Sequence, residues 1–246
     1  MNCSCRLLAR AGVFSLVALF PTLSVADPRA VVELFTSQGC SSCPPADKIM
    51  GELAEDRSLI VMSLPIDYWD YLGWKDTLAR PRHSARQRGY AAKRGDREVY
   101  TPQAVINGVA HVIGSDRKAI DGAIERTNRP HAALSVPVQL TLEGDHLEIS
   151  VAAGEDGPPG EIWLCAIAKS IPVAISRGEN RGRTVTYHNV VRRWLRLGAW
   201  SGAAQNFRLP KSEVQGDGID TVAVLVQAGS IESPSMTVGA AVASLR

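Results

Sequence analysis

The chain has 246 residues, enough for one large domain or two ordinary ones, and 45% of them are hydrophobic. Its 27 Lys and Arg residues nearly balance its 25 Asp and Glu residues, for a formal net charge of +2. This balance excludes the strongly basic or acidic character of a typical nucleic-acid-binding or polyanion-mimicking protein, so we expect no nucleic-acid partner.

The first 26 residues have the pattern of a secretory signal peptide. Arg6 and Arg10 precede an apolar stretch over residues 11–20, and Ser24-Val25-Ala26 supplies the small residues that signal peptidase reads. The apolar stretch is shorter than the roughly 20 residues that span a bilayer. We therefore expect cleavage after Ala26, no stable membrane span afterwards, and a periplasmic or secreted mature protein, in a compartment where disulfides persist.

Cleavage would leave three cysteines, Cys40, Cys43 and Cys165. Cys165 lies in a continuous apolar run, so we expect a buried and inert thiol. Cys40 and Cys43 stand two residues apart between an apolar run and a predicted helix, a spacing typical of redox chemistry. The N-terminus of a helix favours a thiolate over a thiol, and the second cysteine is within reach to close a disulfide.

The first half of the mature chain is predicted to alternate strands and helices. The short helical connection between its first two strands favours a parallel βαβ unit, and Asn107-Gly108 predicts a type I′ hairpin turn. The expected order is a strand over 30–35, a helix over 47–57, a strand over 59–66, a helical insertion over 67–97, strands over 103–106 and 109–113, and a helix after Asp116.

The second half is predicted to contain strands and no strong helix, which is typical of a β-sandwich. We expect a first domain over residues 27–130 and a β-sandwich-like domain over 131–246. The expected strands cover residues 136–142, 147–151, 162–168, 184–191, 206–209 and 221–228.

Three segments carry a resemblance to a known family: residues 35–47, with the sequence FTSQGCSSCPPAD, residues 66–74 and residues 178–184. They resemble an uncharacterised family of secreted thioredoxin-like proteins, catalogued as domain of unknown function 1223. The resemblance spans nearly the whole mature chain. It implies an α/β thioredoxin-like N-terminal domain, in which helices flank a mixed sheet.

The same resemblance implies roles for three residues. Pro102 would be a cis-proline opposite the cysteine pair, and Thr101 would contact a bound peptide. Glu33 falls near the place of a buried acid that takes a proton from the second cysteine. The loop after Glu33 is one residue longer than in thioredoxins, and a Glu paired with a nearby Arg is an equally good interpretation.

Pro44-Pro45 is a second departure from the thioredoxin pattern. Proline is tolerated in the first turn of a helix but removes hydrogen bonds further in. We therefore expect the helix to begin near Cys43 or Pro44, with Cys40 on a looser turn ahead of it. This position weakens the effect of the helix dipole on Cys40.

The favoured function is thiol–disulfide exchange with protein or peptide thiols and disulfides, without a cofactor. Cys40 would form a mixed disulfide that Cys43 resolves. The alternative is a non-catalytic thioredoxin-fold binding module, in which the pair binds copper(I) or is a structural disulfide near a protein partner. A disulfide that closes so small a loop contributes little through chain entropy, and the five histidines show no spacing that completes a zinc site.

Aromatic residues gather in the predicted insertion. Trp69, with Tyr68, Tyr71 and Trp74, either lines a peptide groove beside the cysteines or forms the core under the insertion. Trp69 is our candidate substrate-binding residue in this group. Basic residues follow from Arg80 to Arg97, and we interpret them as a solvated helix face. The alternative is a surface for an anionic partner or a membrane.

Overall fold

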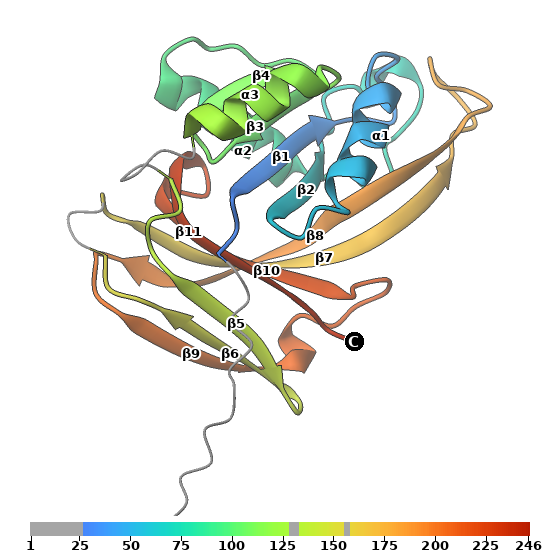
Figure 1. Ribbon diagram of the computed structural model, residues 1–246. Coiled ribbons are helices and arrows are strands. Elements are labelled where there is room, and N and C mark those ends of the chain that lie inside the picture. Colours follow the sequence, from blue (N-terminus) through green and yellow to red (C-terminus); the bar gives the residue numbers. More distant parts are fainter. Residues whose placement is uncertain (1–26, 128–132, 155–157) are drawn as a thin grey trace, which may run out of the picture.

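The structure is a computed structural model that describes residues 27–127, 133–154 and 158–246 (Figure 1). The predicted signal peptide and the predicted domain boundary near residue 130 lie outside the described residues. Among the described helices none has the length and apolar character needed to cross a membrane.

The described chain forms three α-helices, two 3₁₀ turns and eleven strands. The helical segments are α1 (Pro44–Leu53), η1 (Asp70–Leu72), α2 (Pro81–Arg94), α3 (Arg117–Thr127) and η2 (Lys211–Glu213). The strands are β1 (Ala30–Thr36), β2 (Leu59–Pro65), β3 (Gln103–Ile106), β4 (Ala110–Ile113), β5 (Val138–Glu143), β6 (His146–Val151), β7 (Gly160–Ala174), β8 (Thr184–Trp200), β9 (Gln205–Pro210), β10 (Thr221–Ser230) and β11 (Ser233–Ser244).

Eight strands form one mixed sheet in the order β11-β10-β7-β8-β2-β1-β3-β4, and β5, β6 and β9 form a second, antiparallel sheet. In the large sheet, β1 runs parallel to β2 and antiparallel to β3. Strands β7, β8, β10 and β11 are antiparallel neighbours. The long strands β7 and β8 cross from one half of the molecule to the other (Figure 1).

The prediction of a helix-flanked thioredoxin-like α/β domain followed by an independent β-sandwich is wrong. Strands from the second half of the chain extend the sheet of the first half, because β8 lies parallel to β2 at Ser63↔Val190. The molecule is therefore mostly β, and its helices cover only part of a sheet that both halves build. Apolar periodicity identifies strands, but it does not say which strand each one pairs with.

The helices lie on opposite faces of the β1–β4 part of the sheet. Every residue of β1 is buried, so its two faces serve different cores. Val32 and Leu34 pack in a cluster with apolar residues of α1 and α3. Val31 and Phe35 point to the other face, where Tyr90 of α2 joins the cluster. The continuous apolar run of β1 reflects this burial on both sides.

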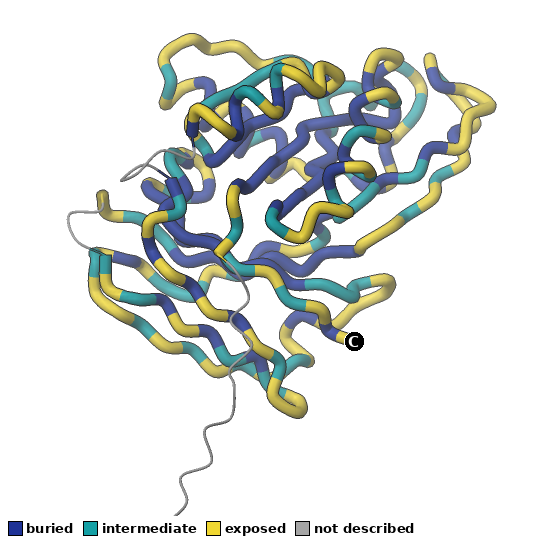
Figure 2. Tube along the Cα trace, viewed as in Figure 1, coloured by how far each residue is buried: buried dark blue, intermediate teal, exposed yellow. Residues whose placement is uncertain are grey.

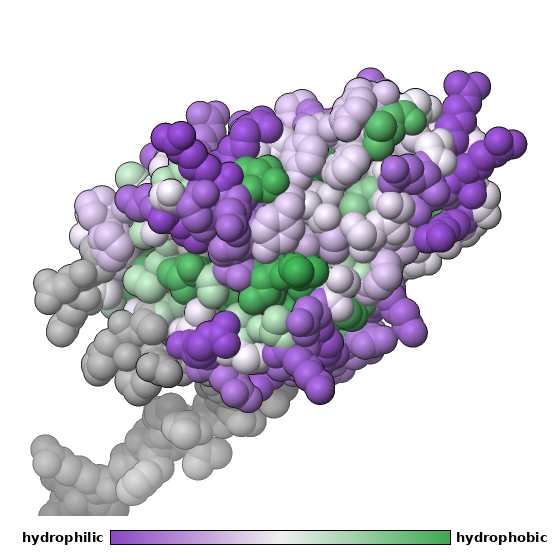
Figure 3. Space-filling model, turned by 90° about the horizontal axis from the view of Figure 1, so that it is seen from above, coloured by the Kyte–Doolittle hydropathy of each residue, from purple (hydrophilic) through white to green (hydrophobic). Residues whose placement is uncertain are grey.

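The three-stranded sheet packs against the other end of the large sheet. Buried residues alternate with exposed ones along β5 and β6, as expected for strands with one solvated face. Their buried side chains form one core with inward residues of β7, β10 and β11, and Figure 2 shows this buried layer between the two sheets. Seen from above, the molecule presents a mostly hydrophilic surface with smaller hydrophobic areas (Figure 3).

Several local predictions are confirmed. Helix α1 begins at Pro44 with Cys43 as its N-cap. Asn107 and Gly108 have φ values of 52° and 72°, which a type I′ turn requires at both central positions. Strand β11 and the second half of β8 were not predicted.

Candidate functional site

The centre of the candidate site is a disulfide between Cys40 and Cys43, whose Cα atoms lie 5.4 Å apart. It follows the end of β1 and leads directly into α1, because the backbone N–H of Asp47 donates to the carbonyl oxygen of Cys43. Cys43 is completely buried, whereas Cys40 is 2% exposed. The first two helical residues, Pro44 and Pro45, have no backbone N–H, and the N–H groups of Ala46 and Asp47 both donate to the carbonyl oxygen of Cys43.

A distant loop holds the backbone around Cys40. The buried side-chain amide of Asn180, between β7 and β8, donates to the carbonyl oxygens of Gln38 at 3.0 Å and Cys40 at 2.8 Å. Glu179 accepts a hydrogen bond from the backbone N–H of Ser41 at 3.2 Å. The resemblance singles out residues 178–184, and the sequence leaves open whether they dock the two halves of the chain or form a binding surface. The structure places this loop beside the disulfide.

Thr101, Pro102 and Trp69 lie together at this site. The Thr101–Pro102 peptide bond is cis, and the carbonyl oxygen of Thr101 lies 3.8 Å from Sγ of Cys40. The indole Nε1–H of Trp69 donates to Oγ1 of Thr101 at 2.8 Å. Trp69 also stacks on Tyr71, with ring centroids 6.4 Å apart, and Tyr71 is 78% exposed. Trp69 therefore packs on the core, as one of the two interpretations predicts, whereas Tyr71 faces solvent.

Glu33 is held in a buried ion pair rather than beside the cysteines. Its carboxylate accepts hydrogen bonds from the guanidinium of Arg86 on α2, and both side chains are at most 2% exposed. Arg86 also donates to Tyr90 and to Gln227 of β10. The alternative of a Glu paired with an Arg is therefore confirmed. Arg86 corrects our interpretation of the basic residues as a solvated face, because it is fully buried.

The sequence analysis missed a buried acid on α1. Asp47 is 1% exposed; its Oδ1 accepts a hydrogen bond from the hydroxyl of Thr36 at 2.8 Å, and its Oδ2 has no partner among the described residues. Burial raises the pKa of Asp47 to about 8, against the opposing effect of the Thr36 hydrogen bond, and the nearby charge of Asp76 raises it further. Asp47 is thus a protonated carboxylic acid near neutral pH.

Asp47 follows Cys43 by four residues, and Cys43 already has helical backbone angles. Residues at this spacing are neighbours on one helix face, with Cβ atoms about 5–6 Å apart. Both side chains are buried, so both lie on the inward face of α1. The sequence signal that could have identified Asp47 is its position four residues after the second cysteine of the pair.

The buried carboxylate of Asp76 holds the backbone that leads into the disulfide loop. Its carboxylate accepts hydrogen bonds from the backbone N–H groups of Gln38, Leu78 and Ala79. Burial raises the pKa of Asp76. Burial also raises the pKa of Tyr187 on β8, and the negative charges of Asp47 and Asp76 raise it further. The disulfide loop is therefore backed by several buried ionisable groups.

The free cysteine and a cluster of possible metal ligands have structural explanations. Cys165 is buried and free, and burial raises the pKa of its thiol, as expected for an inert cysteine.

Ligand atoms of Asp96, Glu98 and His111 lie within 4.8 Å of one another. Arg94 pairs with Asp96 at 2.7 Å, and Tyr100 hydrogen-bonds with His111. These contacts explain the cluster without an ion.

Comparisons with known proteins relate the whole chain to others. The crystal structure of protein AGR_C_4864 from Agrobacterium tumefaciens is similar, with a TM-score of 0.78 and 34% identity over 88% of this chain and 94% of that one. HBP35 of Porphyromonas gingivalis has a TM-score of 0.60 and 14% identity over 89% of this chain and 76% of its own, which is a likeness of fold alone.

No curated protein matches the chain in sequence. Residues 31–227 match the family model described as "Protein of unknown function (DUF1223)". This match covers the disulfide, the Thr101–Pro102 bond and the loop that carries Asn180. The chain belongs to this DUF1223 family.

Proposed function

We propose that the chain performs thiol–disulfide exchange through Cys40 and Cys43, outside the cytoplasm. The observation that carries the proposal is the buried carboxyl of Asp47, one helical turn after Cys43, whose Oδ2 has no hydrogen-bond partner among the described residues. A disulfide that only braced the loop would have no use for such an acid. A buried polar atom without a partner is costly, so its retention beside a reactive pair is best explained by proton transfer.

Exchange by the reduced protein begins at Cys40. Its thiolate attacks one sulfur of a substrate disulfide, forms a mixed disulfide, and releases the other substrate sulfur as a thiolate. Asp47 first loses its proton to solvent, which a pKa of about 8 allows in a minor fraction of molecules near neutral pH. Cys43 then gives its proton to ionised Asp47 and attacks Sγ of Cys40. This step restores the Cys40–Cys43 disulfide and releases the second substrate thiolate. The substrate gains two electrons, and a dithiol reductant must return them to the pair.

The acidity of Asp47 supports this role. Its pKa of about 8 lies near neutral pH, and a general base is most useful when its pKa is close to the working pH. In the opposite direction, protonated Asp47 returns the proton to Cys43 when a substrate dithiol is oxidised.

Substrate contacts would come from the residues around Cys40. The carbonyl oxygen of Thr101 and the stacked rings of Trp69 and Tyr71 border the sulfur. An extended peptide would donate a backbone N–H to the carbonyl oxygen of Thr101 and lay an apolar side chain on Tyr71. Aromatic surfaces of this kind supply contact area at little cost in conformational entropy.

Reduction of insulin by dithiothreitol tests the proposal, with precipitation of the insulin chains as the readout. The unchanged protein should accelerate it, and Cys40→Ser should abolish the acceleration. Cys43→Ser should trap a mixed disulfide. Asp47→Asn should slow turnover by about a hundredfold, whereas Cys165→Ser is the matched control and should leave the rate unchanged.

Two outcomes would contradict the proposal. One is equal activity of the protein and Cys40→Ser. The other is stoichiometric copper(I) binding by the reduced pair with no catalysis of exchange, which would favour a binding module.

A further inference from the structure

A pocket lies at the opposite end of α1 from the disulfide. Its volume is about 410 Å³, within the range of small-molecule sites. Ala54, which caps the C-terminus of α1, lines it, whereas Cys43 precedes the N-terminus. Ten helical residues separate the two ends by about 15 Å, so the pocket and the disulfide are different sites.

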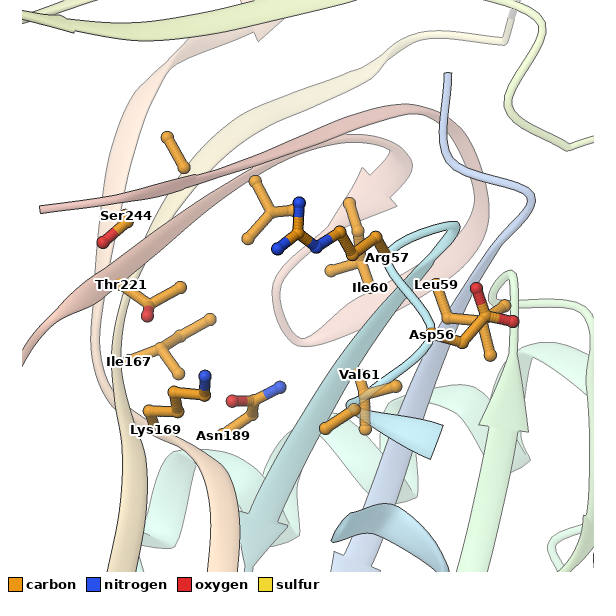
Figure 4. A pocket seen from close by; sticks show the side chains of 13 residues that line it. Asp56, Arg57, Leu59, Ile60, Val61, Ile167, Lys169, Asn189, Thr221 and Ser244 are labelled. Carbon is orange, nitrogen blue, oxygen red and sulfur yellow. The ribbon is translucent and has the colours of Figure 1, made fainter. Parts of the chain in front are cut away.

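The pocket exists because two strands diverge. Among the described residues, β2 pairs with β8 only at Ser63↔Val190, although it pairs with β1 along its whole length. The part of β2 before Ser63 therefore has no strand partner on its β8 side. Leu59, Ile60 and Val61 from this part line the pocket, and β7, β8, β10 and β11 supply the opposite wall (Figure 4).

The lining combines an apolar base with a polar rim. Ile60, Val61 and Ile167 are buried and form apolar walls. Arg57 reaches in from the α1–β2 connection, and Lys169 and Asn189 come from β7 and β8 (Figure 4). The neighbouring register pairs Ala168↔Val190 and Ser170↔His188 place Lys169 opposite Asn189.

These three polar side chains are not engaged elsewhere. In the described part of the chain, Arg57 and Lys169 make no ion pair, and neither of them nor Asn189 makes a side-chain hydrogen bond to another residue. Asp56 also lines the pocket, but it pairs with Arg29 at 3.2 Å and accepts hydrogen bonds from Ser58. Two positive charges and one amide are therefore available to a ligand.

Asn189 has an unusual backbone for a strand residue, with a φ value of 50°. Asparagine tolerates this left-handed conformation better than most residues, and such conformations concentrate at functional sites. It interrupts β8 next to Val190, where the contact with β2 ends. The distortion therefore lies at the point where the pocket opens.

We propose that this pocket binds a small amphipathic anion, a single carboxylate on an apolar body. The carboxylate would accept hydrogen bonds from Arg57, Lys169 and Asn189, because charge-assisted hydrogen bonds are the strongest such contacts available there. The apolar body would lie against Ile60, Val61 and Ile167. Binding at this site does not depend on exchange at the cysteines.

Octanoate is the probe, with octylammonium as the cation of the same chain length, and isothermal titration calorimetry gives the affinities. Octanoate should bind with one site per chain, and octylammonium should not bind. The exposed side chains allow a double variant, Arg57→Gln with Lys169→Gln, that should fold normally and lose at least about tenfold in octanoate affinity. Lys118→Gln, an exposed lysine on α3, is the control and should bind as the unchanged protein does.

Backbone amide NMR shifts locate the bound probe. The largest octanoate-dependent changes should fall on Val61, Asn189 and Thr221, which line the pocket. The proposal is overturned if octanoate does not bind, if octylammonium binds equally well, if the double variant retains full affinity, or if the shifts map elsewhere. Cys40→Ser should bind octanoate unchanged, so failure of the exchange proposal leaves this result interpretable.

Discussion

The side-chain amide of Asn180 donates a 2.8 Å hydrogen bond to the carbonyl oxygen of Cys40, although 140 residues separate the two in sequence. The same amide reaches the carbonyl of Gln38. The loop that carries the disulfide is thus held in place by the hairpin between β7 and β8. Residues from both halves of the chain build the candidate site.

Asn180→Ala should therefore destabilise the protein. It leaves the carbonyl oxygens of Gln38 and Cys40 without their donor, and an unsatisfied buried group costs about 1–3 kcal/mol. Urea unfolding of the oxidised protein measures the loss. Glu179→Gln, which keeps an acceptor for the N–H of Ser41, should change stability by less than about 0.5 kcal/mol. Equal stabilities for the two variants would show that the tether is not needed.

The pH dependence of stability should report the protonated state of Asp47. Its pKa is about 8 in the folded protein and about 3.9 in an unfolded chain. Between these values the folded protein binds one more proton than the unfolded chain. Stability therefore falls as the pH rises, by up to about 1.4 kcal/mol per unit. Buried Asp76, whose pKa is also raised, contributes with the same sign.

His83 acts in the opposite sense over the acidic part of that range. Burial lowers its pKa to about 4, so between about 4 and 6.5 the unfolded chain binds the extra proton and stability rises with pH. From about pH 6.5 to 8 the effect of Asp47 remains. Unfolding across this window should show a decline that Asp47→Asn removes and that the exposed control Asp217→Asn keeps. A flat profile for the unchanged protein would rule out a buried neutral carboxyl.

Removal of one partner from the buried Glu33–Arg86 pair should be costly. Arg86→Met leaves the Glu33 carboxylate buried without compensation, which typically costs about 3–5 kcal/mol. The double variant Glu33→Met with Arg86→Met removes both charges and should recover much of the loss. Arg88→Met, on the exposed face of the same helix, is the control. Thermal unfolding of the unchanged protein and these three variants measures the loss and its recovery, and a double variant no better than Arg86→Met would disprove the prediction.

Two glycine positions should respond to alanine with opposite signs. A Cβ on Gly89 of α2 would lie 2.1 Å from the carbonyl oxygen of Glu232, so Gly89→Ala must push α2 away from the β10–β11 hairpin. A Cβ on Gly122 of α3 would meet only the flexible end of Arg126 at 3.2 Å. Gly122→Ala should stabilise the protein by about 0.5–1 kcal/mol. Melting temperatures that rise for both variants would contradict the close contact at α2.

Structural features that depend on neighbouring residues could be predicted from the sequence. Pro44-Pro45 predicted the start of α1, and Asn107-Gly108 predicted a turn with two positive φ values. The apolar run from Ala30 to Phe35 predicted a strand, and the structure shows a strand that is buried along its whole length. Each of these features depends on residues within a few positions of one another, and propensity and turn chemistry act on that scale.

The parts that could not be predicted depend on distant contacts. Nothing near Val190 indicates that β8 lies beside β2, and this pairing merges the two expected domains into one sheet. Glu33 and Asp47 are both acids near the cysteines in sequence, but their roles differ with the face they occupy. Glu33 faces Arg86 from α2, whereas Asp47 faces inward from α1 beside Cys43. The sequence places Asn180 in a loop between two predicted strands, but it does not indicate that its side chain binds the backbone beside Cys40.

The narrow seam between β2 and β8 limits how the chain can be divided. Across it, the hydroxyl of Ser63 donates to the carbonyl of His188, and a second link between the two halves of the chain runs from Arg86 of α2 to Gln227 of β10. A polypeptide split between residues 127 and 133 would yield two fragments, each with an uncovered sheet edge, and exposed edges promote aggregation. The fragments would be complementary rather than autonomous, so co-expression, not separate production, is the condition under which such a split protein would reassemble.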